Sequence, residues 1–134
     1  MRKLYAICLT FAVLGTAAYG AKKYPMTAAS MVPGARAEVA IGKDKNGNTR
    51  LKMVVEHLAN LENLTPRASA YVVWFQERGG ISQNQGQLRM DKNLKATFET
   101  GTPLKSFDVF VTAEQDSRTK DPSVPEVLKA TIQP

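Results

Sequence analysis

The segment that decides the fold spans residues 36–57 and reads RAEVAIGKDKNGNTRLKMVVEH. Apolar and polar side chains alternate along both of its arms, as in Val39–Ile41 and Leu51–Val55. Such alternation is typical of β-strands that bury one face. Asn46 and Gly47 lie between the arms, and this pair suits the positive φ angles of a tight hairpin turn. The sequence therefore predicts a β-hairpin over residues 36–57.

Five further segments have the character of strands. The most strand-like is Ser69–Glu77, which is rich in aromatic and β-branched side chains. The other four are residues 86–90, 94–99, 107–114 and 127–132. Turn residues separate these segments, and no long amphipathic helix interrupts them. We predict an all-β fold, a seven-stranded antiparallel Ig-like β-sandwich in which two sheets bury facing side chains.

Alternation also predicts which side chains face the interior. We expect Trp74 to face inward, so that Tyr71 and Phe75 face outward, and we place Phe110 on an outer face as well. The predicted inward set is Val39, Ile41, Leu51, Met53, Val55, Val72, Trp74, Leu88, Leu94, Phe98, Phe107, Val109, Val111, Leu128 and Ile132. Two interpretations of the outer residues remain open. Either a loop covers them, with the leucine-bearing segment 58–68 as the candidate, or they form an exposed apolar patch that holds a partner. On the second interpretation, Tyr71, Phe75 and Phe110 are the predicted partner-binding residues.

The amino terminus has the pattern of a secretory signal peptide. Two basic residues precede an apolar run from Leu4 to Val13, and small residues follow as far as Ala21. We predict residues 1–20 to be a cleaved signal peptide, residues 21–35 a flexible lead, and residues 36–134 the sandwich domain. The apolar run is shorter than the roughly 20 residues that a membrane span needs. A retained membrane anchor is the alternative.

Composition excludes several chemistries for the exported chain. The 134-residue precursor carries a net charge of +6, and removal of Arg2 and Lys3 leaves 16 basic and 12 acidic residues. These charges alternate in sign, whereas nucleic-acid binding favours a clustered basic stripe. Removal of Cys8 leaves His57 as the only histidine and no cysteine. Blue-copper centres and Cys/His zinc sites are therefore excluded. We predict no catalytic residue, no metal ligand and no cofactor.

Four short motifs occur in an order that resembles a known family. They are Tyr71–Trp74, Gly86–Leu88, Phe107–Glu114 and Pro125–Ala130, with Phe98 between the second and the third. In this order they resemble the extracytoplasmic C-terminal domain of anti-sigma-K-type factors. The chain carries only a predicted signal peptide where those factors have a sigma-binding domain and a membrane span. The resemblance implies a stand-alone exported sandwich without catalytic residues.

Together these observations predict an exported, non-enzymatic domain in the periplasm or secreted medium. We expect a monomer or weak oligomer with a recognition or structural role towards an unknown envelope protein. We expect no nucleic-acid partner, and no membrane span after signal cleavage. Three alternatives stay open: a small-ligand or metal carrier, a membrane-anchored sensor subunit, and an enzyme that uses His57.

Overall fold

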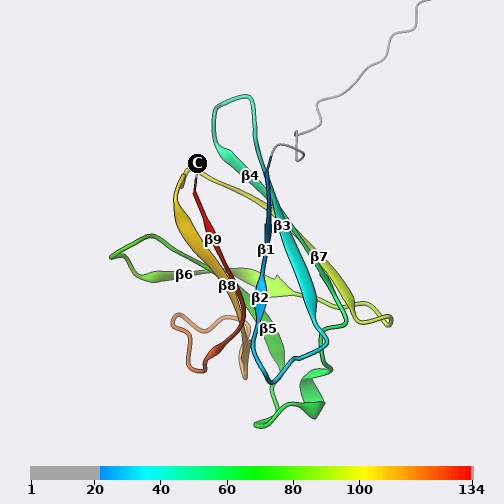
Figure 1. The fold of residues 1–134 in the computed structure, drawn as a ribbon. Coiled ribbons are helices and arrows are strands. Elements are labelled where there is room, and N and C mark those ends of the chain that lie inside the picture. The colour runs from blue at the N-terminus through cyan, green and yellow to red at the C-terminus, as the bar shows by residue number, and fades with distance from the viewer. Residues whose placement is uncertain (1–21, 134) are drawn as a thin grey trace, which may run out of the picture.

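The computed structural model describes residues 22–133. The predicted signal peptide, its cleavage site and Cys8 lie outside the described residues. Within residues 22–133 the chain is all-β, and its two antiparallel sheets face each other as a sandwich (Figure 1). In the same part of the chain, no helix has the length and apolar character that a membrane crossing requires.

Nine strands make up the two sheets. They are β1 (Lys22–Pro25), β2 (Thr27–Ala28), β3 (Arg36–Lys43), β4 (Thr49–Glu56), β5 (Ala70–Gln76), β6 (Ser82–Leu88), β7 (Lys95–Thr102), β8 (Phe107–Glu114) and β9 (Glu126–Ile132), with a single 3₁₀ turn at Leu61–Asn63. One sheet has the order β1-β3-β4-β7, and the other has the order β2-β9-β8-β5-β6. We call them the four-stranded and the five-stranded sheet. Neighbouring strands are antiparallel throughout.

The predicted hairpin is confirmed as β3 and β4, which pair from Arg36 opposite Glu56 to Lys43 opposite Thr49. Gly47 has a φ of 82° in the turn. The Asp44 carboxylate accepts hydrogen bonds from the backbone N–H groups of Asn46 and Asn48, each at 2.9 Å. The bond from Asn48 contributes most to holding the pKa of Asp44 below its ordinary value. The turn is thus fixed by its own side chain as well as by its glycine.

The prediction of seven strands after a flexible lead is wrong, because residues 22–28 supply two more. β1 pairs with β3, and β2 pairs with β9, so the chain crosses between the sheets at Met26, whose side chain is buried. Both strands are short and lie at sheet edges. Edge strands this short need no alternating pattern. Pro25 is tolerated in β1 because one edge of this strand forms no hydrogen bonds to a neighbouring strand.

The sixth strand lies earlier in the chain than predicted. β6 spans Ser82–Leu88 rather than residues 86–90, and it pairs only with β5. Its sequence is almost entirely polar, since a strand at the rim of a sheet has little apolar surface to bury. This polar strand forms one wall of the candidate site.

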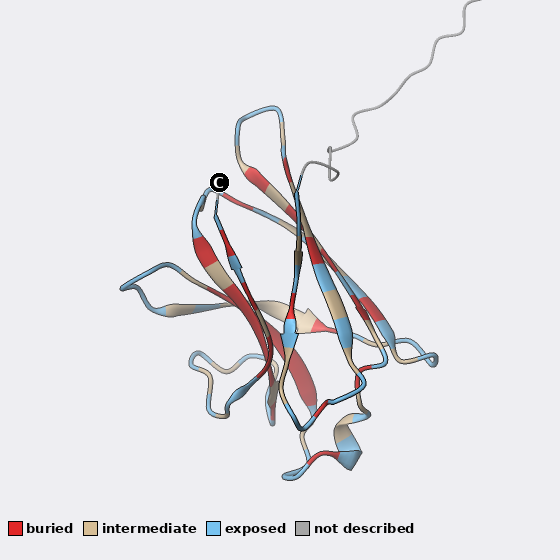
Figure 2. Ribbon diagram, in the orientation of Figure 1, coloured by how far each residue is buried: buried red, intermediate tan, exposed pale blue. Residues whose placement is uncertain are grey.

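The main core lies between the sheets, where buried positions follow one another along the strands (Figure 2). Most of the predicted inward set is buried, but Ile41, Leu94 and Phe98 are only partly so. The predicted orientation of β5 is wrong. Its odd-numbered side chains belong to the main core, and Val72 and Trp74 lie in a separate cluster. Alternation could not decide the orientation because both faces of this strand are apolar.

Candidate binding groove

Two of the three predicted partner-binding residues lie in the interior between the sheets. Tyr71 is 1% exposed and Phe75 is 0% exposed. The Tyr71 hydroxyl donates a hydrogen bond of 2.8 Å to the carbonyl of Ala59, and burial raises the pKa of Tyr71 to about 12. The ring of Phe75 packs against that of Phe107, with 4.7 Å between the centroids. Neither side chain is accessible to a partner in this fold.

The third predicted residue, Phe110, lies on the opposite face of the five-stranded sheet and is also buried. It forms a cluster with Val72 and Trp74 that is separate from the main core. The rings of Trp74 and Phe110 are nearly parallel, at 13°, and their centroids are 6.2 Å apart. We call these three residues the outer cluster. No exposed aromatic patch is formed by Tyr71, Phe75 and Phe110.

A chain of buried polar groups borders the outer cluster. The indole N–H of Trp74 donates to Thr112 Oγ1 at 2.8 Å, and the Thr112 hydroxyl donates to Glu114 Oε2 at 2.6 Å. Glu114 is 2% exposed. The backbone N–H and the hydroxyl of Ser123 also donate to the carboxylate of Glu114. Four hydrogen bonds thus connect the sheet to residue 123, which lies in the loop before β9.

The loop of residues 115–125 covers the outer cluster. It is tied to β8 by the bonds between Ser123 and Glu114. It is tied to β6 by the Asn84 side chain, whose amide donates to the carbonyls of Ser117 and Thr119 at 3.0 and 2.8 Å. Since β5 lies between β6 and β8, these two attachments span the outer face of β5.

A loop therefore does cover the outer face, but it is not the predicted segment 58–68. That segment packs against the main core instead, where Leu58 and Leu64 are buried beside the end of β5. The carbonyl of Ala59 accepts the Tyr71 hydroxyl there. The leucines of segment 58–68 thus contribute to the main core. The loop that covers Trp74, residues 115–125, has an almost wholly polar sequence instead.

A hollow of about 630 Å³ lies where the 115–125 loop meets β6. We call it the β6 groove. Its lining residues are Ser82, Gln83, Asn84, Gln85, Gly86, Gln87, Arg89, Ser117, Arg118, Thr119 and Lys120. One wall is a strand at the rim of the sheet and the other is the loop, so the groove is open along its length.

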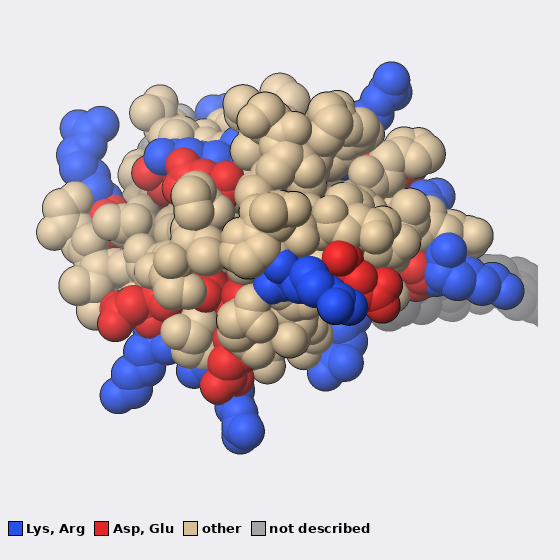
Figure 3. Space-filling model, turned by 90° about the horizontal axis from the view of Figure 1, so that it is seen from below, with Lys and Arg blue, Asp and Glu red and all other residues tan. Residues whose placement is uncertain are grey.

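The lining of the β6 groove is cationic and rich in amides. Arg89, Arg118 and Lys120 are exposed, and none of them pairs with an acidic side chain within residues 22–133. No aspartate or glutamate lines the hollow. On the face of the molecule seen from below, acidic and basic side chains intermix (Figure 3). The groove is a site where unpaired positive charge and hydrogen-bonding side chains coincide.

A bulge in β6 gives the groove its shape. Trp74 is opposite Asn84, but Val73 is opposite Gly86, so that Gln85 is an extra residue. Gly86 has a φ of 127°, and a β-carbon there would lie 3.6 Å from the ring of Phe98. The side-chain oxygen of Asn84, Oδ1, accepts a hydrogen bond of 2.8 Å from the backbone N–H of Gly86. Asn84 therefore fixes both the bulge and the covering loop.

The histidine and the methionines of the described chain, whose side chains could serve catalysis or metal binding, are divided between the surface and the core. His57 is exposed at the end of β4, with a φ of 60°. Met26 and Met53 are buried, whereas Met31 is 39% exposed. Within residues 22–133 no group of three or more histidine, cysteine, aspartate or glutamate side chains is placed to hold a metal ion.

Sequence reasoning missed the groove residues. The run Ser82–Gln87 is polar and lacks periodicity, and the basic residues of the groove come from two segments far apart in the chain. The signal in the sequence is a glutamine-rich run that follows the turn glycines Gly79 and Gly80 and ends near Arg89. No known protein-family model matches this chain, and no similar protein was found among curated proteins. The resemblance to anti-sigma-K-type factors therefore stays a prediction.

Proposed function

We propose that this chain is an exported, non-enzymatic recognition domain that binds an acidic, extended segment of another envelope protein in the β6 groove. The observation that carries this proposal is the groove lining itself, which has three unpaired cations, four amide side chains and no acidic residue. A ligand that complements this surface carries carboxylates and also has groups that bond to amides.

An extended acidic peptide meets both requirements. Arginine binds carboxylates through two parallel hydrogen bonds, which suits Arg89 and Arg118. Side-chain amides donate and accept at once, so Gln83, Gln85 and Gln87 can bond to the main chain of a peptide. Because the cations are exposed, we expect an interaction of modest affinity that weakens as salt is added.

The strand arrangement supports the finer proposal of an Ig-like sandwich. Strands β3 to β9 correspond to the seven predicted strands, with three in one sheet and four in the other. The motifs that resemble anti-sigma-K-type factors fall on β5, β6, β8 and the start of β9. In this proposal β1 and β2 are additions that close one side of both sheets.

Export rests on the sequence of residues 1–20 and has its own test. We expect the protein to be recovered from the extracytoplasmic fraction with a new amino terminus at Ala21. Mass spectrometry of the purified protein checks this. An intact Met1 in a cytosolic fraction would contradict export, whereas an intact Met1 in the membrane fraction would favour the anchored alternative.

The groove is tested with a labelled peptide of alternating glutamate and threonine. We expect it to bind and to shift the NMR signals of Ser82–Arg89 and residues 117–120. The double variant Arg89→Glu/Arg118→Glu is expected to abolish this binding. The control Arg36→Glu/Arg67→Glu makes the same charge change at exposed residues outside the groove lining. Equal loss in both variants, or equal binding of a glutamine-threonine peptide, would refute the proposed site.

A further inference from the structure

One end of the sandwich gathers four lysines from three segments of the chain. Lys43 and Lys45 belong to the end of β3 and the hairpin turn, Lys22 begins β1, and Lys105 lies in the loop between β7 and β8. Lys22 of β1 pairs with Ile41 of β3. Ile41 lies two residues before Lys43, so Lys22 and Lys43 are separated by about 7 Å along the strand. We call these four lysines the lysine end.

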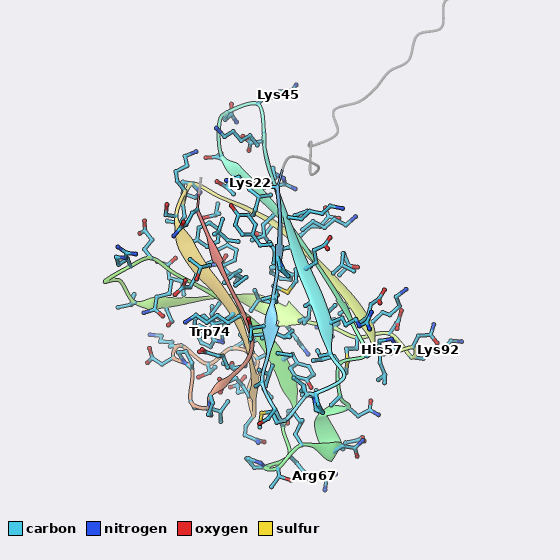
Figure 4. The ribbon with its side chains drawn as sticks, in the orientation of Figure 1. Lys22, Lys45, His57, Arg67, Trp74 and Lys92 are labelled. Atoms are coloured by element: carbon cyan, nitrogen blue, oxygen red, sulfur yellow. The ribbon has the colours of Figure 1, made fainter. Side chains whose placement is uncertain are left out.

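Hydrogen bonds hold this end together. The ammonium of Lys105 donates to the carbonyl of Gly47 in the hairpin turn, and that of Lys22 donates to the carbonyl of Gln133. The hairpin, the loop before β8 and the two ends of the described chain therefore meet at one place. Figure 4 shows Lys22 and Lys45 there, with Arg67 and Lys92 far from them.

Positive charge at the lysine end is poorly compensated. Asp44 is the acidic residue of the hairpin turn, and its carboxylate is already bonded to Asn46 and Asn48. Lys43 and Lys45 are exposed, and neither forms an ion pair with another part of residues 22–133. The remaining basic and acidic residues of the described chain nearly balance.

The chain enters the sandwich at this same end. Residues 1–21 join at Lys22, and they include the apolar run Leu4–Val13. The covering loop, which forms one wall of the β6 groove, begins at Glu114, at the other end of β8 from the loop that contains Lys105. A membrane that contacts the lysine end would therefore lie at the opposite end of β8 from the covering loop.

We propose that the lysine end docks on the anionic phospholipid surface of a membrane. Anionic headgroups attract lysines that lie within about 10 Å of the surface, and each lysine there strengthens binding about fivefold. Four lysines on three separate segments form a broad contact rather than a pocket for one ion. This inference does not depend on the proposed function of the groove.

The test measures binding of the exported protein to vesicles, with and without one quarter phosphatidylglycerol in phosphatidylcholine. The readout is the difference between anionic and neutral vesicles, so an uncleaved leader that inserts into both does not obscure it. We expect Lys43→Gln/Lys45→Gln to weaken binding to anionic vesicles about 25-fold. The matched control is Arg67→Gln/Lys92→Gln, which removes two exposed charges that also form no ion pair within residues 22–133. We expect less than a twofold change from it.

Three results would overturn this proposal. One is equal binding of the protein to neutral and anionic vesicles. Another is an equal loss in both double variants, which would show an effect of net charge alone. The third is binding to a soluble sulfated polysaccharide without binding to anionic vesicles. Unchanged thermal unfolding of both variants confirms that the comparison concerns the surface and not the fold.

Discussion

The two faces of the five-stranded sheet are buried by different means, although β5 contributes apolar residues to both. Its inner face packs Tyr71, Val73 and Phe75 against the other sheet within the main core. Its outer face packs Val72 and Trp74 with Phe110 alone, beneath a loop that is held by polar bonds. The inner face is buried by the opposite sheet of the sandwich, whereas the outer face is buried only by the loop of residues 115–125.

This difference predicts two levels of stability. The main core joins strands from both sheets, so it can open only when the domain unfolds. The cover over the outer cluster is attached at Glu114 and Asn84, and it can open while the sheets remain intact. Because Asn84 also shapes the β6 groove, opening of the cover would change the candidate binding site as well.

The same substitution on both faces gives the largest expected effect. We expect Phe75→Ala to lower the free energy of unfolding by about 3–5 kcal/mol, because it leaves a cavity in the main core. We expect Phe110→Ala to cost at least about 1 kcal/mol less, since the loop can settle into the space. Urea unfolding followed by circular dichroism measures both. Equal losses would contradict the distinction between the faces.

Loss of the buried carboxylate is expected to release the cover. Glu114→Ala leaves the donors of Thr112 and Ser123 without their acceptor, which costs about 1–3 kcal/mol for each donor that stays buried. Trp74 is the only tryptophan and is fully buried, so its fluorescence reports on this face. We expect acrylamide to quench Trp74 in urea concentrations at which the circular dichroism is still native.

The variant Glu114→Gln is the matched control for this experiment. It keeps the size of the side chain and one acceptor oxygen, so we expect it to retain most of the protection of Trp74. The opposite result is that, in Glu114→Ala, the quenching of Trp74 and the circular dichroism change at the same urea concentration. That result would show that the cover opens only when the whole domain unfolds.

A smaller loss is expected from the bulge that shapes the groove. Gly86 has a φ of 127°, where a side chain is strained, and a β-carbon would contact the ring of Phe98. We expect Gly86→Ala to cost about 1–3 kcal/mol. NMR signals of Asn84 and residues 117–120 should shift, because the Asn84 amide holds both the bulge and the loop. Gly34→Ala, at a glycine without close neighbours, is the control.

The sequence predicted the sheets better than it predicted their faces. Alternation located the hairpin of β3 and β4, because each of its strands has one polar and one apolar side. It failed for β5, which is apolar on both sides, and for β1 and β2, which are too short to show a period. Periodicity carries information only where the two faces of a strand meet different surroundings.

The candidate site was beyond the reach of pattern analysis for a related reason. Its residues come from β6 and from a loop about 30 positions later, and what joins them is the pair of hydrogen bonds from Asn84. An asparagine in a polar run gives no sign of such partners. The predicted contact residues are apolar side chains on a strand face expected to lie outside the core, but each of them is buried in the fold.

The inner face also has a titratable group, Tyr71, whose contribution to stability changes only at alkaline pH. Burial raises the pKa of Tyr71 to about 12, above its ordinary value of 10.0, so folding favours the neutral phenol. The resulting stability is fully present below pH 10 and is lost as the pH rises towards 12.

We expect urea unfolding to show this loss in the wild type beyond any loss in Tyr71→Phe. That variant lacks both the titration and the bond to Ala59, so it is less stable at neutral pH but loses less between pH 10 and 12. If the two proteins lost the same free energy of unfolding between pH 10 and 12, the pKa of Tyr71 would not be raised by burial in the core. The inner face would then open locally at the edge near Ala59, as we propose for the outer one.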